Sequence, residues 1–162
     1  MQHTLLNERG FGLVELSVVM ALIGVLSIFA VPSLLSYYQS SSLTAGTEEL
    51  AAVMNRARHL AISRNTSVCV ERNGTMVRFR TTTAVPPNCT GTIFTGGGTD
   101  SGGNIRIANS LQVSGAINVI FTNAGGATAS SGSMPVTYTL TDPQTSRSRN
   151  VVVTSTGRVS IQ

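Results

Sequence analysis

Side chains that could act as acids, bases or metal ligands are few in this chain and widely separated. Of the two histidines, His3 lies close to the start, and His59 lies among arginines on a segment with helical spacing, where we expect it on the surface. Glu48 and Glu49 are adjacent, so on a helix their carboxylates point apart instead of pairing as acid and base. No Ser/His/Asp order, HExxH motif or Walker loop is present. The sequence therefore predicts no catalytic residue, no metal site and no cofactor.

One carboxylate stands in an unusual place. Residues 9–35 read RGFGLVELSVVMALIGVLSIFAVPSLL, and Glu15 is the charged residue that follows Arg9 in this run. A carboxylate inside an apolar helix is costly to bury and tends to mark a functional position. The alternative is a residue tolerated near the lipid headgroups, because Glu15 lies close to the start of the run. The sequence favours the functional interpretation.

The chain has two cysteines, Cys69 and Cys89, and both lie beyond the apolar run. They lack CxxC spacing and a nearby histidine, which argues against a metal site or thiol catalysis. In an oxidising periplasm such a pair forms a disulfide. Closing a loop of about twenty residues should stabilise the fold by roughly 3 kcal/mol. A disulfide is therefore predicted.

The elements that position these residues begin with a long helix. The apolar run of about 25 residues would form a helix of about 37 Å, enough to cross the core of a bilayer. From Leu43 onward, apolar residues recur at helical spacing and leave most charged residues on the other side. This stripe consists of Leu43, Leu50, Val53, Met54, Ala57, Leu60 and Ala61. We predict one helix of about fifty residues that ends near Asn65, apolar all round at first and one-sided afterwards.

After Asn65 the hydrophobic period changes to the alternation typical of strands. Strands are predicted at 67–72, 75–82, 92–95, 104–108, 116–122, 136–141, 150–155 and 158–161. Asn73-Gly74 and Thr156-Gly157 are the expected hairpin turns, and the glycine-rich segments 96–103 and 125–132 are expected to be loops. The predicted fold class is α+β, with a long N-terminal helix packed by its second half on a C-terminal antiparallel β-sheet domain.

The junction before the apolar run gives a first resemblance. An ordinary secretory signal is cut after its apolar run, whereas the only plausible cut here, after Gly10, precedes it. Gly10 followed by Phe11, then Glu15, Gly24 and Pro32, resembles the class III signal of type IV pilins and of the pseudopilins of type II secretion. The alternative is an unrelated single-span anchor. The resemblance implies that a prepilin peptidase cuts between Gly10 and Phe11 and that Phe11 is N-methylated.

The resemblance also implies roles for residues inside the helix. The ammonium group of Phe11 in one subunit would meet Glu15 of its neighbour and set the axial register, even if the net energy is modest. Pro32 removes a backbone donor and Gly24 lowers helix propensity, so the helix can lengthen or melt between them on assembly, or else simply kink. The implied organisation is a leader at 1–10, a hydrophobic helix for the membrane anchor and filament core at 11–38, an amphipathic helix half at 39–65 and a β-rich domain at 66–162.

Residues 47–70, TEELAAVMNRARHLAISRNTSVCV, are similar to the GspH/FimT family of minor pilins and pseudopilins. The family's AR…A…R pattern is matched at Ala57-Arg58, Ala61 and Arg64. The resemblance implies a non-enzymatic minor pilin of a type IV pilus, anchored in the inner membrane with a periplasmic domain. Its implied partners are other pilins or pseudopilins and the prepilin peptidase. The alternative is a pseudopilin of type II secretion, and Pro32 favours the pilus.

DNA is a partner that the sequence leaves open. All eleven basic residues are arginines and the formal net charge is +4, which is compatible with anionic partners. Some FimT-like proteins bind DNA through a C-terminal GRxR tail; this chain has Gly157 and Arg158, but Ser160 replaces the second arginine. Arg147 and Arg149 could compensate, because phosphate contacts need charge more than sequence. If the last two strands pair through their hairpin turn, these two arginines and Arg158 would form one basic patch.

Overall fold

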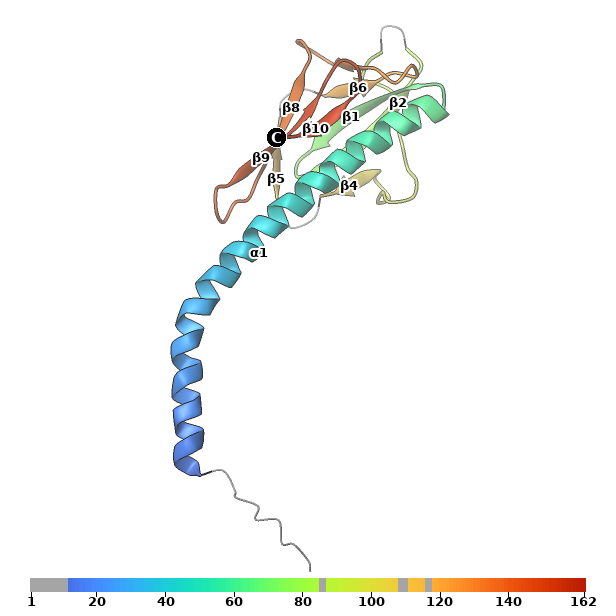
Figure 1. Ribbon diagram of the computed structural model, residues 1–162. Helices are drawn as coiled ribbons and strands as arrows, with labels where there is room; N and C mark the ends of the chain where they lie inside the picture. The colour runs from blue at the N-terminus through green and yellow to red at the C-terminus, as the bar shows by residue number, and fades with distance from the viewer. Residues whose placement is uncertain (1–11, 85–86, 108–110, 116–117) are drawn as a thin grey trace, which may run out of the picture. The chain divides into compact units, whose positions relative to one another are not determined.

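The computed structural model describes residues 12–84, 87–107, 111–115 and 118–162 (Figure 1). The chain divides into two compact units, Met1–Tyr38 and Gln39–Gln162. Helix α1 (Leu13–Ser63) is 51 residues long and contributes to both. The long N-terminal helix followed by antiparallel strands confirms the predicted α+β fold class.

In the first unit, every described side chain from residue 12 to residue 38 is exposed. The helix continues through Gly24 and Pro32. No single described helix has the length and hydropathy to cross a membrane by itself, but Leu13–Phe29 and Ser33–Ser63, a pair that meets at a bend, pass together by length and composition. The described side chains of this unit therefore leave its apolar surface uncovered.

In the second unit, the remainder of α1 buries one stripe of residues. This stripe contains Leu43, Gly46, Thr47, Leu50, Val53, Met54, Ala57 and Ala61. Their spacing of three and four residues puts them on one face of a 3.6-residue helix. The helix ends where Asn65 takes a φ of 49°, a left-handed conformation that asparagine tolerates, and the Thr66 amide donates to the Ala61 carbonyl at 3.1 Å.

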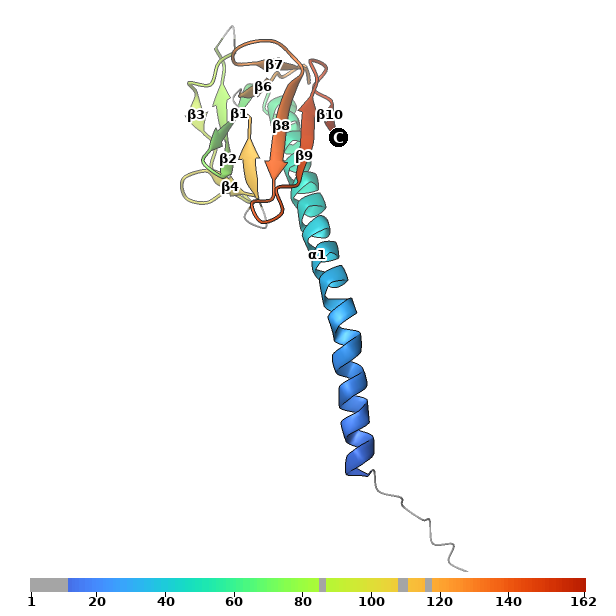
Figure 2. The same ribbon diagram turned by 90° about the vertical axis from the view of Figure 1, so that its left-hand side faces the viewer.

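The strands form two antiparallel sheets (Figures 1 and 2). The first has the order β3-β2-β1-β6-β7, with β4 also paired to β2; the second has the order β10-β9-β8-β5. The first sheet comprises β1 (Ser67–Asn73), β2 (Met76–Thr82), β3 (Thr92–Ile93), β4 (Asn104–Arg106), β6 (Val119–Phe121) and β7 (Ala127–Ala129). The second comprises β5 (Gln112–Ser114), β8 (Val136–Thr141), β9 (Ser148–Val153) and β10 (Val159–Ile161).

The core lies between the second half of α1 and the two sheets. Its largest fully buried side chains include Phe79 of β2, Phe121 of β6 and Leu140 of β8, together with Leu50 and Met54 of the helix. Figures 1 and 2 show this part of α1 running alongside both sheets. One hydrophobic cluster therefore holds the helix and both sheets as a single body within residues 39–162.

Two strands were not predicted from the sequence. Strand β5 is absent from the predicted set, and β7 falls inside the segment 125–132, which was expected to be a loop. β7 reads Ala-Thr-Ala after two glycines, and alanine and glycine both have low strand propensity. It forms because Val119–Phe121 offers a buried partner strand with matching register. The prediction for 125–132 was therefore wrong, since tertiary pairing overrides local propensity there.

Candidate functional site

The predicted processing site, Gly10 and Phe11, lies outside the described residues. The next predicted site residue, Glu15, is exposed in the first turn of α1. The described residues around it are exposed as well, so the described part of this unit supplies no buried environment for the carboxylate.

Arg58, one of the residues of the family pattern, holds two turns in place. Its Nε donates to the carbonyl oxygen of Gly125 at 2.8 Å. Gly125, in the turn between β6 and β7, is buried with a φ of +83°, and Gly157, in the turn between β9 and β10, is buried with a φ of +74°. A Cβ added to Gly157 would overlap the Gly125 carbonyl oxygen and lie 3.1 Å from Arg58 Nε. These three residues, far apart in the sequence, form one tightly packed contact, which we call the Arg58 contact.

The other two arginines near the end of α1 also contact loops. The guanidinium of Arg56 donates to the carbonyl of Gly97, and that of Arg64 lies 4.8 Å from the ring centroid of Phe94. The Phe94 ring is 6.4 Å from Phe79 of the core. The basic residues of this helix end thus position the segments that follow β3 and β6, a role that the pattern alone did not reveal.

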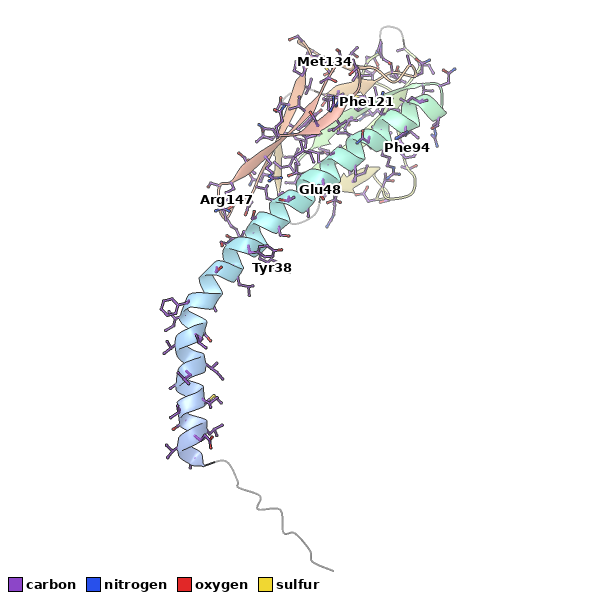
Figure 3. All side chains as sticks on the ribbon, viewed as in Figure 1. Tyr38, Glu48, Phe94, Phe121, Met134 and Arg147 are labelled. Carbon is purple, nitrogen blue, oxygen red and sulfur yellow. A yellow bond between two sulfur atoms is a disulfide. The ribbon has the colours of Figure 1, made fainter. Side chains whose placement is uncertain are left out.

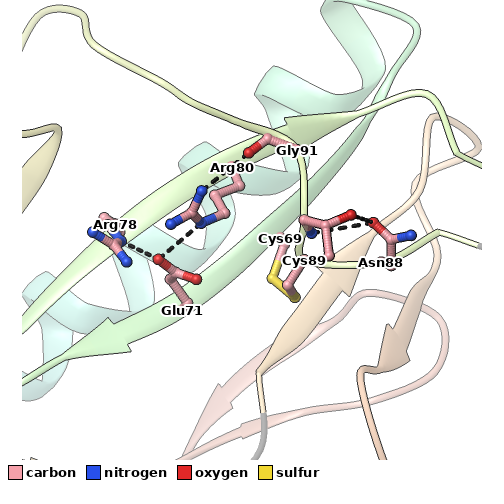
Figure 4. The surroundings of a disulfide bond; sticks show 8 residues. Cys69, Glu71, Arg78, Arg80, Asn88, Cys89 and Gly91 are labelled. Carbon is pink, nitrogen blue, oxygen red and sulfur yellow. Dashed lines mark hydrogen bonds and ion pairs between the residues drawn. A yellow bond between two sulfur atoms is a disulfide. The ribbon is translucent and has the colours of Figure 1, made fainter.

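The predicted disulfide between Cys69 and Cys89 is confirmed (Figure 4). It joins the central strand β1 to the segment that follows β2, with the two Cα atoms 5.3 Å apart and Cys69 fully buried. Nearby, the Glu71 carboxylate accepts hydrogen bonds from Arg78 and, at 3.0 Å, from Arg80. Arg80 also donates to the Gly91 carbonyl at 3.1 Å. Cys89 is therefore attached to the sheet covalently, and Gly91 is attached by a charge-assisted hydrogen bond.

The structure places Arg158 apart from the other two arginines proposed for DNA. Arg147 lies in the turn between β8 and β9 (Figure 3), and Arg149 lies at the start of β9. The last two strands do pair, but Arg158 lies opposite Thr154, at the far end of β9. Thr154 comes five positions after Arg149, which is about 16 Å along a strand. All three side chains are exposed, and among the described residues none of them forms an ion pair.

Together these features define a class of protein. A helix with an exposed apolar first part, whose second half packs on antiparallel sheets, is the architecture of a pilin-like filament subunit. The family model described as Type II transport protein GspH matches residues 46–157, and the prokaryotic N-terminal methylation motif matches residues 5–31. The chain therefore belongs to the GspH family of pilin-like proteins. No curated protein and no solved structure matches it.

Family membership establishes the general role of the chain. Pilins and pseudopilins are structural, non-enzymatic proteins that assemble with one another, and the methylation motif is the sequence by which prepilin peptidase processes them. The chain is accordingly a pilin or pseudopilin with a membrane-anchoring N-terminal segment.

Proposed function

We propose that this protein is a minor pilin of a type IV pilus. It enters the inner membrane as a prepilin with its β-domain in the periplasm, is cut after Gly10 and N-methylated on Phe11, and then joins or primes the filament through its N-terminal helix. The observation that carries the proposal is the unbroken exposure of the described side chains from residue 12 to residue 38.

The size of this apolar surface supports the proposal that lipid covers the helix first and that neighbouring subunits cover it in the filament. Covering a large apolar side chain is worth about 1.5 to 3 kcal/mol, and the exposed apolar side chains of this segment run from Leu13 to Tyr38. Exposed to water, they would cost tens of kcal/mol, far more than the usual stability of a domain. Lipid covers them before assembly, and the helices of neighbouring subunits replace the lipid in the filament.

Glu15 supplies the register of assembly in this proposal. Glu15 lies in the first turn of α1, and in this proposal its carboxylate meets the ammonium group of Phe11 in the next subunit. A charge pair away from water favours one axial offset strongly over others, because any other offset leaves a charge without its partner.

The processing step can be tested by intact-mass measurement of protein purified from the native host. The expected mass corresponds to loss of residues 1–10 and gain of one methyl group. A Gly10→Val variant is the matched control and should keep its leader, because the cut requires a small residue before it. Retention of Met1 in the parent protein, or loss of the apolar helix, would refute the assignment.

The role of Glu15 can be tested with Glu15→Ala and Glu15→Asp. Glu15→Ala should insert into the membrane normally, because removing a charge makes insertion easier, but it should be depleted from sheared filaments. Glu15→Asp keeps the charge and should be depleted less. Normal incorporation of Glu15→Ala would show that the register does not depend on this carboxylate.

The secretion pseudopilin is the second candidate, and both share the features described so far. Pro32 favours the pilus, because a proline at this place suits a helix that is remodelled on assembly. Deleting the gene gives a direct choice between them. Loss of surface pili with normal protein secretion supports the minor pilin, whereas a secretion defect with normal pili supports the pseudopilin.

DNA binding is a third candidate, supported by the exposure of Arg147, Arg149 and Arg158 without ion pairs to the described residues. Because the length of β9 separates Arg158 from Arg147 and Arg149, we propose two points of contact with one DNA duplex, about 16 Å apart. A soluble fragment beginning at Gln39 can be titrated with labelled duplex at several salt concentrations. Removing Arg147 and Arg149 together should lower the salt slope by about two units, and removing Arg158 by about one. Absence of binding at low salt would eliminate this candidate.

A further inference from the structure

Two tyrosines mark the end of the apolar part of α1. Tyr37 and Tyr38 are 72% and 75% exposed, and the residues that follow, Gln39, Ser40 and Ser41, are polar. Figure 3 shows the Tyr38 ring projecting from the helix. Among the described residues, none is hydrogen-bonded to either phenol hydroxyl.

The other hydroxyls of this segment behave differently. Ser17 donates to the Val14 carbonyl and Ser27 to the Ile23 carbonyl, each at 2.7 Å. These serines satisfy their hydrogen bonds inside the helix and can therefore lie in hydrocarbon. A phenol hydroxyl with no partner cannot do so cheaply, because a buried polar group without a hydrogen bond is costly. The two tyrosines need water or polar headgroups at the depth where they sit.

The spacing along the helix gives that depth. Glu15 and Tyr37 are 22 residues apart by their numbers, which is about 33 Å along the helix at 1.5 Å per residue, and the bend between Phe29 and Ser33 makes the depth across the bilayer somewhat smaller. The hydrocarbon core of a bilayer is about 30 Å thick. If Glu15 lies at one boundary of the core, Tyr37 and Tyr38 lie at the other. Phe29, which has no hydroxyl, then lies deeper than Tyr37, about 12 Å from it along the helix.

We propose that Tyr37 and Tyr38 bind the periplasmic headgroup layer of the bilayer and, with Glu15 at the cytoplasmic boundary, fix the depth of the subunit before assembly. Tyrosine suits this layer because its ring is apolar and its hydroxyl is polar. In this position the Glu15 carboxylate stays hydrated until the subunit leaves the membrane. The inference rests on the proposed membrane insertion and adds the lipid contact that sets the depth of the helix in the bilayer.

The chain has no tryptophan, so single-tryptophan variants report one position each. The full-length protein would be reconstituted into vesicles of phosphatidylethanolamine and phosphatidylglycerol. A fraction of the lipid would carry bromine either high or low on its acyl chains, and bromine quenches tryptophan only at its own depth. The variants are Tyr38→Trp, Phe29→Trp as the deep position and Ile62→Trp, in the second unit, as the position outside the bilayer.

We expect shallow bromine to quench Tyr38→Trp at least twofold more than deep bromine, the reverse order for Phe29→Trp, and no quenching of Ile62→Trp. If Phe29→Trp follows this order but Tyr38→Trp is quenched best by deep bromine, or by neither, the anchor is refuted while membrane insertion stands. In that case the tyrosines contact neighbouring helices or water instead. If Phe29→Trp is not quenched by either lipid, membrane insertion itself fails, and the proposed function fails with it.

Discussion

Replacing Gly157 with alanine should destabilise the β-domain far more than an ordinary glycine substitution in a turn. Gly157 has a φ of +74° and is buried. Its added Cβ would overlap the carbonyl oxygen of Gly125, a backbone atom that cannot rotate away. The turn between β6 and β7 would have to move, and the 2.8 Å hydrogen bond from Arg58 to Gly125 would be lost.

The magnitude follows from two separable costs. A left-handed alanine costs roughly 1 to 2 kcal/mol, partly offset by a less flexible unfolded chain. Loss of a part-buried, charge-assisted hydrogen bond costs about 1.5 to 3 kcal/mol more. Gly74 provides the matched control, because its φ is +65° but a Cβ there meets nothing within 4 Å. We expect the free energy of unfolding to fall by about 3 to 4 kcal/mol in Gly157→Ala and by about 1 kcal/mol in Gly74→Ala.

Urea unfolding of the fragment that begins at Gln39 measures both values with the same baseline. The midpoint for Gly157→Ala should fall well below that of Gly74→Ala, at an unchanged slope with denaturant. Adding Arg58→Ala to Gly157→Ala should then cost less than Arg58→Ala costs alone, because the hydrogen bond is already broken. Equal losses for the two glycine variants would show that the Arg58 contact contributes little.

Two further predictions concern the same domain. Thiol labelling of the unreduced, denatured domain should find no free cysteine, and reduction should then release Cys69 and Cys89 and lower the free energy of unfolding by roughly 3 kcal/mol; two reactive thiols before reduction would contradict the disulfide. Hydrogen bonds from the Gln144 amide at 2.9 Å and the Thr145 hydroxyl at 2.8 Å hold the pKa of the Asp142 carboxyl below its usual range. The contribution of the Asp142 carboxylate to the free energy of unfolding is thus fully present above about pH 4, and it is lost as pH falls through the lowered pKa. Asp142→Asn should therefore be less stable than the parent at pH 7 by an amount that shrinks below pH 4, and a pH-independent difference in urea unfolding would contradict this.

The helix was the element best predicted from the sequence, because its apolar pattern is long and its stop signal is a single residue next to its end. Seven apolar positions from Leu43 to Ala61 repeat at helical spacing, and the structure buries all of them except Leu60, which is half-buried. Asn65 ends the helix in the left-handed conformation that makes asparagine a common stop. The hairpin between β1 and β2 was equally accessible, since Gly74 takes the positive φ that its turn requires.

The short strands could not be predicted in the same way. β5 and β7 have three residues each, too few to display an alternation. They exist because Val113 and Ala127 are drawn into the core next to strands that are already paired. The Arg58 contact could not be predicted from the sequence either, because Arg58 and Gly125 are 67 positions apart. A pattern in the sequence identified Arg58, but not the carbonyl oxygen that it binds.

The predicted basic patch of Arg147, Arg149 and Arg158 shows another limit of prediction from the sequence. The pairing of β9 with β10 was predicted correctly, yet antiparallel pairing through a short turn puts Arg158 beside the end of β9, while Arg149 lies at its beginning. A longer β9 would separate them further. Sequence proximity therefore brought these arginines onto neighbouring strands without bringing their side chains together.

Most of the positive charge of the chain has a structural use, and this affects how a DNA-binding pattern should be interpreted. Six of the described arginines contact carbonyls, a carboxylate or a ring within the fold: Arg56, Arg58, Arg64, Arg72, Arg78 and Arg80. Gly157, the glycine of the GRxR-like tail, is explained by its place against Gly125 and Arg58, with no need for a ligand. Only Arg158 of that tail is left to meet DNA. A chain that loses Arg158 should therefore keep its stability, whereas one that loses Gly157 should unfold more easily whether or not DNA is ever bound.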